Sequence, residues 1–316
     1  ALPKVDALVK KTISHGYTAL ALTDYDNMYG AIEFYKECKK KNIKPIIGSE
    51  LKIKISDRLF TVILLAKTYE GYKNLMRLVS VANLKSIDIK EPYLEFADLE
   101  GISKGIIMLD GGPWGEIGDA LKQNDKKRAK VIYDKYKNYF EDVYIEVTPH
   151  TFMDYGTEMR QNAIDFAKEC NLPTVATINS HYLSPNDKSA HKTLISVHND
   201  IDSAEYYKVN FAQADLSYLS PNEIQEKFSD VPEAIANTVK IADEINFEVP
   251  LGAWVFPAIE FKKNYDDDLR ELAYAGLIDR KLEATEEVIK RLDYELKVIK
   301  DKGYSPYFLV VYDLLR

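Results

Sequence analysis

"YTALALTDYDNMYGAIEFYKECKKKNIKPIIGSELKI" (residues 17–53) has the pattern that decides the fold. Residues 17–24 and 44–53 are apolar runs bounded by polar loops, which predicts two strands, and residues 29–41 have the apolar spacing of a helix. A strand, a helix and a second strand in this order are typical of a unit with parallel strands. The first strand ends at Asp24, where an α/β enzyme presents functional side chains.

The same alternation continues through the first two-thirds of the chain. Further strands are predicted over residues 59–67, 105–110, 142–150 and 172–181, and further helices over residues 4–15, 70–83, 115–139, 157–170 and 187–198. Because the apolar runs are continuous, we expect parallel strands that are buried on both faces. Six or seven such units favour a closed α/β barrel over an open sheet.

Composition limits the classes of function that fit. The chain has 316 residues, of which 46% are hydrophobic and 29% charged, with a net charge of −8. No apolar run approaches the roughly 20 residues that cross a bilayer, so we expect no membrane contact. Cys38 and Cys170 are the only cysteines, which excludes a disulfide framework and fits the cytoplasm. Positive and negative residues are mixed, so this part of the protein is not expected to be the main grip on nucleic acid.

The character of the sequence changes after about residue 200, where helix signals replace strand signals. Residues 250–261, "PLGAWVFPAIEF", are typical of an irregular linker, and two amphipathic helices follow. We therefore predict a first domain over residues 1–258 and a helical segment over residues 259–316. "YDDDLR" (265–270) resembles a carboxylate cluster, but acidic residues that open a helix are usually capping residues.

Polar residues that can bind metals lie where the predicted strands end. They are Asp24, Glu50, Asp110, His150, Asn179 and His181. The carboxyl ends of parallel strands form one face, so we expect these side chains to meet. Imidazole and carboxylate groups are the ligands that metal-assisted hydrolysis needs. Glu50, His150 and His181 are the strongest candidates, with Asp24 as a fourth ligand or a supporting partner.

Other motifs have ordinary structural explanations. His15 precedes Gly16 at a predicted helix end and fits a C-terminal cap. His191 and His198 are seven residues apart on one helix, which favours packing or solvent exposure. "GGPWGEIG" (111–118) fits a turn that leads into a helix better than a nucleotide-binding loop. No G-x-S-x-G motif occurs, and covalent catalysis has no support.

Residues 19–51, "ALALTDYDNMYGAIEFYKECKKKNIKPIIGSEL", closely resemble the PHP (polymerase and histidinol phosphatase) domain of bacterial DNA polymerase III alpha subunits. The resemblance continues through "VILLAKTYEGYKNLMRLVS", "PTVATINSHYLSPNDKSAH", "PEAIANTVKIADEINFEV" and "RLDYELKVIKDKGYSPYFLVVYDLLR", in family order. It implies a (β/α)7-type barrel whose first strand is missing here, because the chain begins just after it. A mostly helical segment that leads into the polymerase palm follows.

The resemblance also implies a metal site, held by His, Asp and Glu positions, which this sequence retains only in part. Asp24, Glu50, His150 and His181 match family ligands, whereas Tyr25, Thr61 and Asn179 replace others. We therefore expect a remnant site with no cofactor, although weakly bound zinc or manganese stays open. A site with several metal ions is not expected.

Such a chain is expected to be a non-catalytic scaffold that stabilises the polymerase and docks a proofreading exonuclease. The parent protein would be a nucleotidyltransferase in DNA replication. It would use Mg²⁺, contact DNA and the sliding clamp elsewhere, and hold its catalytic aspartates beyond this chain. The alternatives are an active metal-dependent phosphoesterase, either a 3′ exonuclease or a pyrophosphatase, and a stand-alone metabolic enzyme on the same barrel.

Overall fold

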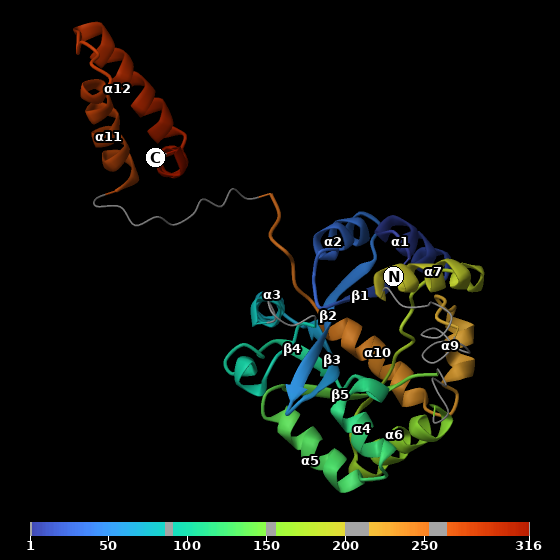
Figure 1. Ribbon diagram of the computed structural model, residues 1–316. Coiled ribbons are helices and arrows are strands. Elements are labelled where there is room, and N and C mark those ends of the chain that lie inside the picture. Colours follow the sequence, from blue (N-terminus) through green and yellow to red (C-terminus); the bar gives the residue numbers. More distant parts are fainter. Residues whose placement is uncertain (1, 86–90, 150–155, 200–214, 253–263, 316) are drawn as a thin grey trace. The chain divides into compact units, whose positions relative to one another are not determined.

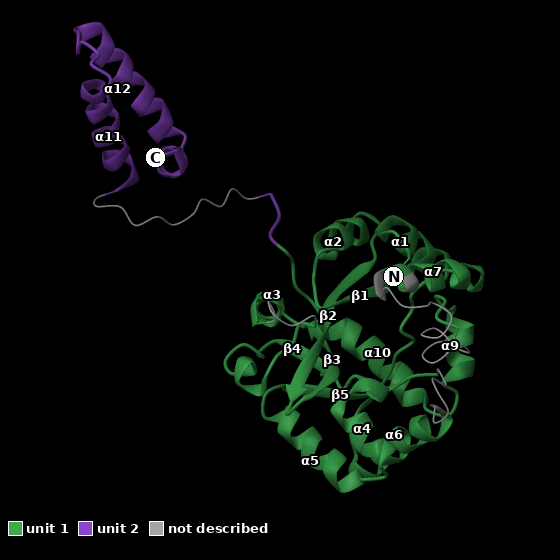
Figure 2. Cartoon of the chain, in the orientation of Figure 1, with its two compact units in different colours: residues 1–249 green, residues 250–316 purple. Residues whose placement is uncertain are grey.

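Two units make up the chain, residues 1–249 and residues 250–316 (Figure 2). The computed structural model describes residues 2–85, 91–149, 156–199, 215–252 and 264–315. The boundary predicted near residue 258 lies outside these residues. Among the described residues, no helix is both long and apolar enough to cross a membrane.

A six-stranded sheet forms the first unit, with its strands in sequence order (Figure 1). The strands are β1 (Ala19–Tyr25), β2 (Lys44–Ile55), β3 (Arg58–Ala66), β4 (Ile106–Leu109), β5 (Asp142–Val147) and β6 (Thr174–Ala176). The sheet curls like part of a barrel and, in the described part of the chain, β1 and β6 each pair with one strand only. The predicted α/β class and all six strands are confirmed.

One strand departs from the parallel arrangement expected. β1 pairs parallel with β2, but β3 is antiparallel to both β2 and β4. Only Ser56 and Asp57 separate the paired residues Ile55 and Arg58, and Ser56 has a φ of 55°. A connection this short joins antiparallel neighbours and cannot cross over to a parallel one. The prediction that residues 59–67 form a parallel strand was therefore wrong. The described strands form a curled sheet with one antiparallel member, and they do not form a closed ring.

Helices cover both faces of the sheet. They are α1 (Val5–Ser14), α2 (Ala31–Lys40), α3 (Tyr69–Lys85), α4 (Glu116–Lys122), α5 (Lys126–Lys137), α6 (Gly156–Cys170), α7 (Lys188–Asn199), α9 (Pro221–Lys227) and α10 (Pro232–Glu244). The helix predicted over 115–139 is in fact two helices. Asn124 has a φ of 56° and the Asp125 side chain caps the second helix, so the backbone turns between them.

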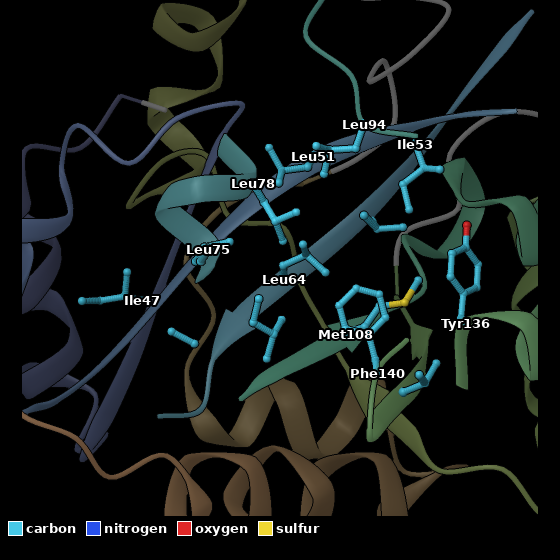
Figure 3. Packing of buried hydrophobic residues seen from close by; sticks show 14 of the residues in the cluster. Ile47, Leu51, Ile53, Leu64, Leu75, Leu78, Leu94, Met108, Tyr136 and Phe140 are labelled. Atoms are coloured by element: carbon cyan, nitrogen blue, oxygen red, sulfur yellow. The ribbon is translucent and has the colours of Figure 1, made fainter. Parts of the chain in front are cut away.

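Alternate residues of each strand enter different apolar cores. Leu64 belongs to the larger core beneath α3, while the next residue, Leu65, belongs to a smaller core that includes Ile241 of α10. Figure 3 shows Leu64, Leu75 and Leu78 packed together in the larger core. Because both faces are covered, the strands read as continuous apolar runs.

The second unit is helical, as predicted. It contains α11 (Tyr265–Asp279), α12 (Glu286–Asp301) and α13 (Ser305–Leu315). The Asn264 side chain caps α11 by accepting a hydrogen bond from the backbone of Asp267, and Asp266, Asp267 and Asp268 lie in the first turn. "YDDDLR" therefore opens a helix as expected, but the capping residue is the asparagine just before it. The Ser305 hydroxyl donates to Asp266 at 2.7 Å and ties α13 to α11.

Gly71 on α3 lies against the backbone of Gly105, so we predict that Gly71→Ala destabilises the first unit. An added Cβ would lie 1.7 Å from the Gly105 carbonyl oxygen, which already accepts the backbone N–H groups of Lys67 and Thr68. The expected loss is about 3 kcal/mol. Gly276→Ala on α11 is the matched control, because no atom lies within 4 Å of the added Cβ. Urea unfolding followed by circular dichroism measures both, and a wild-type midpoint for Gly71→Ala would contradict the prediction.

Candidate functional site

A cavity of about 830 Å³ lies in the first unit and is lined by residues of both β1 and β6. Most of its lining is apolar, and polar side chains gather near the C-terminal ends of these strands. Most of the predicted site residues that the structure describes line this one cavity: Asp24, Tyr25, Glu50, Thr61, Asn179 and His181. Asp110 does not, and lines a separate small cavity. His150 lies outside the described residues.

Strand register explains why Glu50 reaches the site although it is not at the end of its strand. β2 continues to Ile55, but its parallel pairing with β1 places Glu50 beside Tyr25, the last residue of β1. The Ser49 hydroxyl donates to the carbonyl of Asp24 at 2.9 Å and holds the two strand segments in step. Asp24, Tyr25 and Glu50 all line the cavity.

His181 is placed by a loop. β6 ends at Ala176, earlier than the predicted 172–181, and the backbone N–H of His181 donates to the carbonyl of Leu216 at 2.9 Å. The carbonyl of His181 accepts from the backbone N–H of Leu2 at 2.9 Å. Two segments distant in sequence thus position His181, which is 8% exposed.

The Tyr25 side chain contacts the imidazole of His181. The Tyr25 hydroxyl lies 3.3 Å from His181 Nε2, and the rings stack with an interplanar angle of 17°. An imidazole nitrogen that accepts a hydroxyl proton has its lone pair engaged, so it cannot bind a metal at the same time. On the other side, the ring of His191 lies 4.9 Å from that of His181 between centroids.

His191 is buried, which confirms the packing interpretation. Burial lowers its pKa to about 4, so its imidazole is neutral at physiological pH. His15 caps α1 before Gly16, which has a φ of 76°, as predicted. The His198 side chain lies outside the described part of the structure.

A negative charge on Glu50 is unfavourable in this cavity. Burial raises the pKa of Glu50 to about 8, and the nearby Asp26 carboxylate adds to this while Lys52 opposes it. Burial also raises the pKa of Asp24. In the absence of a cation, Glu50 is therefore largely protonated at neutral pH.

The sequence analysis missed Glu146, which lies inside β5 and faces the same cavity. Its pKa is raised to about 8 by burial and by the neighbouring Asp110 carboxylate, while the Thr177 hydroxyl and the Gly111 backbone oppose the shift. The signal was a single charged residue in the apolar run "DVYIEV" (142–147). Charged residues are almost never fully buried without a partner, so this glutamate was a candidate site residue.

The Asp110 side chain accepts hydrogen bonds from backbone N–H groups, including that of Glu146. Asp110 Oδ1 accepts from the backbone N–H of Glu146 at 2.8 Å and of Gly112 at 3.1 Å. Burial raises the pKa of Asp110 to about 6 even so. Both residues line a small cavity of about 30 Å³, which has room for a water molecule. The "GGPW" segment forms the turn that leads into α4, as predicted.

The described residues do not provide a complete metal site. Among them, no group of three or more His, Cys, Asp or Glu side chains lies close enough to hold a metal ion. Thr61 and Asn179 line the cavity but supply only a hydroxyl and an amide, which are weak ligands for zinc. No catalytic step through a metal is derived from these side chains.

Comparison with known proteins identifies the families that the sequence matches. Residues 1–150 match the PHP domain family, and residues 267–316 match the bacterial DNA polymerase III alpha NTPase domain. The solved structure of a protein described as a metal-dependent phosphoesterase from Bifidobacterium adolescentis covers 55% of the chain at 10% identity, with a TM-score of 0.35. This score is too low to support a structural comparison. The sequence match over residues 1–150 is what shows that the chain contains a PHP domain.

Relatives over the whole length give the narrower family. The DNA polymerase III alpha subunit of Buchnera aphidicola subsp. Acyrthosiphon pisum is 33% identical over 331 residues and covers 100% of the chain. That of Aquifex aeolicus is 32% identical and covers 99%. The chain is homologous over its whole length to bacterial DNA polymerase III alpha subunits. It spans 28% and 30% of the length of these two relatives.

Because the pKa of Glu146 is raised, we predict that the free energy of unfolding of the first unit depends on pH. A carboxyl whose pKa rises from 4.5 to about 8 on folding binds more protons in the folded state. Its contribution to stability is therefore present below about pH 4.5 and is lost as the pH rises toward 8. Glu146→Gln removes this loss, so the variant should be more stable than wild type at pH 8, by on the order of 1 kcal/mol.

Thermal unfolding between pH 5 and pH 9 tests this expectation. The difference in melting temperature between Glu146→Gln and wild type should grow as the pH rises. Glu158→Gln, an exposed change on α6, serves as the control and should follow wild type at every pH. A constant difference for Glu146→Gln across the range would show that Glu146 is ionised throughout.

Proposed function

We propose that this PHP domain is a non-catalytic scaffold in the alpha subunit of a bacterial replicative DNA polymerase. It stabilises the polymerase and docks the proofreading exonuclease. The observation that carries the proposal is the 3.3 Å contact between the Tyr25 hydroxyl and His181 Nε2. A tyrosine stands where the family has a histidine ligand, and it engages the retained histidine instead of leaving it open to a metal.

Substitution at three positions supports the same conclusion. Tyr25, Thr61 and Asn179 all line the cavity beside Glu50 and His181. None of them offers the imidazole or carboxylate that a hydrolytic metal centre uses. Reversing one substitution leaves the other two, so catalysis would require several simultaneous changes.

The remaining residues of the parent protein carry the polymerase reaction in this proposal. Residues 259–316 lead into the palm, whose aspartates hold Mg²⁺ beyond this chain. Residues 1–258 form the PHP domain in this proposal. DNA and the sliding clamp are contacted elsewhere in the parent, which works in the cytoplasm.

An active phosphoesterase is the second candidate, and the acidic side chains favour it. Asp24, Glu50 and Glu146 line one cavity, and each has a raised pKa. A bound cation would relieve the unfavourable burial of these carboxylates. Zinc or manganese held by Asp24, Glu50, His150 and His181 would meet that need.

Metal content of the purified protein with its native N-terminus separates the two candidates. The scaffold proposal expects less than one equivalent of zinc or manganese by elemental analysis after dialysis without chelator. Two or more equivalents, together with metal-dependent release of nucleotides from a DNA 3′ end, would establish the phosphoesterase.

Tyr25→His tests whether one restored ligand is enough. We predict that this variant stays inactive as an exonuclease in the presence of zinc or manganese, because Thr61 and Asn179 still leave ligand positions unfilled. Tyr25→Phe is the matched control, since it removes only the hydroxyl that contacts His181. Activity of Tyr25→His above that of Tyr25→Phe and wild type would contradict the prediction.

A further inference from the structure

Helix α10 forms part of the wall of the cavity of about 830 Å³. Ile235, Thr238 and Ile241 of this helix line the cavity. Ile241 also packs in the smaller core, which contains residues of each strand from β2 to β6. Because protein interiors are closely packed, a shift of α10 would change the shape of the cavity.

Polar side chains fasten α10 to the sheet. Asn237 Nδ2 donates to the carbonyl of Thr174, the first residue of β6, at 2.7 Å. The Lys67 ammonium group, which follows β3, lies 2.9 Å from the Glu244 carboxylate at the end of α10 and 2.7 Å from that of Asp142 at the start of β5. These contacts connect α10 with strands on both sides of β4.

The chain stays attached to the first unit for five residues beyond α10. Phe247 packs against both apolar cores. The Tyr35 hydroxyl on α2 donates to the Glu248 carboxylate and accepts the backbone N–H of Val249 at 3.2 Å. Lys39 Nζ, one turn further along α2, donates to the same carboxylate at 2.5 Å. We call these contacts of Tyr35, Lys39, Glu248 and Val249 the Tyr35 anchor.

The Tyr35 anchor lies at the boundary between the two units. Val249 is the last residue of the first unit and is 8% exposed, whereas Leu251 is 43% exposed. Tyr35 is buried, so breaking its hydrogen bonds would leave its hydroxyl with little access to water. Lys39 and Glu248 are both exposed, and an exposed ion pair contributes little. The Tyr35 hydroxyl is therefore the part of the anchor that contributes most to its strength.

We propose that the Tyr35 anchor is a mechanical stop between the two units. It holds the end of α10, and thereby one wall of the cavity, against displacement of the chain beyond residue 249. If the anchor opened, a displacement of residue 250 would act through Phe247 on the last turn of α10, where Ile241 and Ile245 pack. The inference does not rest on the proposed function, because α10 lines the cavity whether or not a metal ion is bound.

Hydrogen exchange of the full 316-residue chain, followed residue by residue by NMR, tests the anchor. Two backbone amides report on it. The N–H of Val249 donates to Tyr35, so its exchange rate reports on the anchor itself. The N–H of Ile245 donates to the carbonyl of Ile241 at 3.1 Å, so its rate reports on the end of α10.

Three variants are compared with wild type. Tyr35→Phe removes the hydroxyl, and Lys39→Ala removes the exposed ion pair. Tyr133→Phe is the matched control, because Tyr133 on α5 is 6% exposed against 5% for Tyr35. Its hydroxyl donates to the carbonyl of Val143 on β5 at 3.3 Å, so this variant also loses one buried tyrosine hydroxyl.

We expect Tyr35→Phe to speed exchange at Val249 and Ile245 by about tenfold or more, because the hydroxyl both donates and accepts a hydrogen bond. Lys39→Ala should change either rate by less than about threefold, because exposed ion pairs are weak. Tyr133→Phe should leave both rates at the wild-type value.

Three results would overturn the inference. A wild-type rate at Val249 in Tyr35→Phe would show that the chain is not held here. Faster exchange at Val249 with an unchanged rate at Ile245 would show that the anchor does not hold α10. An equal acceleration at the buried amides of β3 would show that Tyr35 stabilises the whole core and has no particular role at the boundary.

Discussion

Burial of the sheet on both faces is the constraint on which the rest of the first unit depends. Neighbouring residues of β3, Leu64 and Leu65, enter cores on opposite sides, so the inner strands leave few positions for polar side chains. Ionisable groups are then confined to strand ends and to the cavity between β1 and β6. The clustering of carboxyls in one place follows from the packing and does not by itself indicate catalysis.

Confinement of the carboxyls makes their charge costly. Glu50 and Glu146 both have pKa values raised to about 8, chiefly by burial, and the Asp110 carboxylate adds to the shift at Glu146. A cation would reverse this effect, and protons do so in its absence. The same electrostatics therefore fit either a metal site or a protonated remnant of one. Tyr25 bears on this choice, because its hydroxyl lies 3.3 Å from Nε2 of His181, one of the two ring nitrogens that can bind a metal.

Local patterns were sufficient to predict the elements, and contacts distant in sequence were not. The unit of β1, α2 and β2 could be read from residues 17–53 because strands and helices differ in apolar spacing. The reversed direction of β3 depended on the short turn at Ser56 and Asp57, a signal that was overlooked. The position of His181 could not be read at all, since backbone bonds to Leu216 and Leu2 determine it. Glu146 was missed because a long apolar run concealed one buried charge.

Hydrogen bonds from two neighbouring elements order the chain at the end of β1. An active metal site needs open ligands, and its loops often move as substrate enters. Here the 25–29 loop is restrained by bonds from β2 and α3, and its first residue, Tyr25, closes on His181. The hydrogen bonds that order the ends of the strands therefore stabilise the fold whether or not the cavity holds a metal ion.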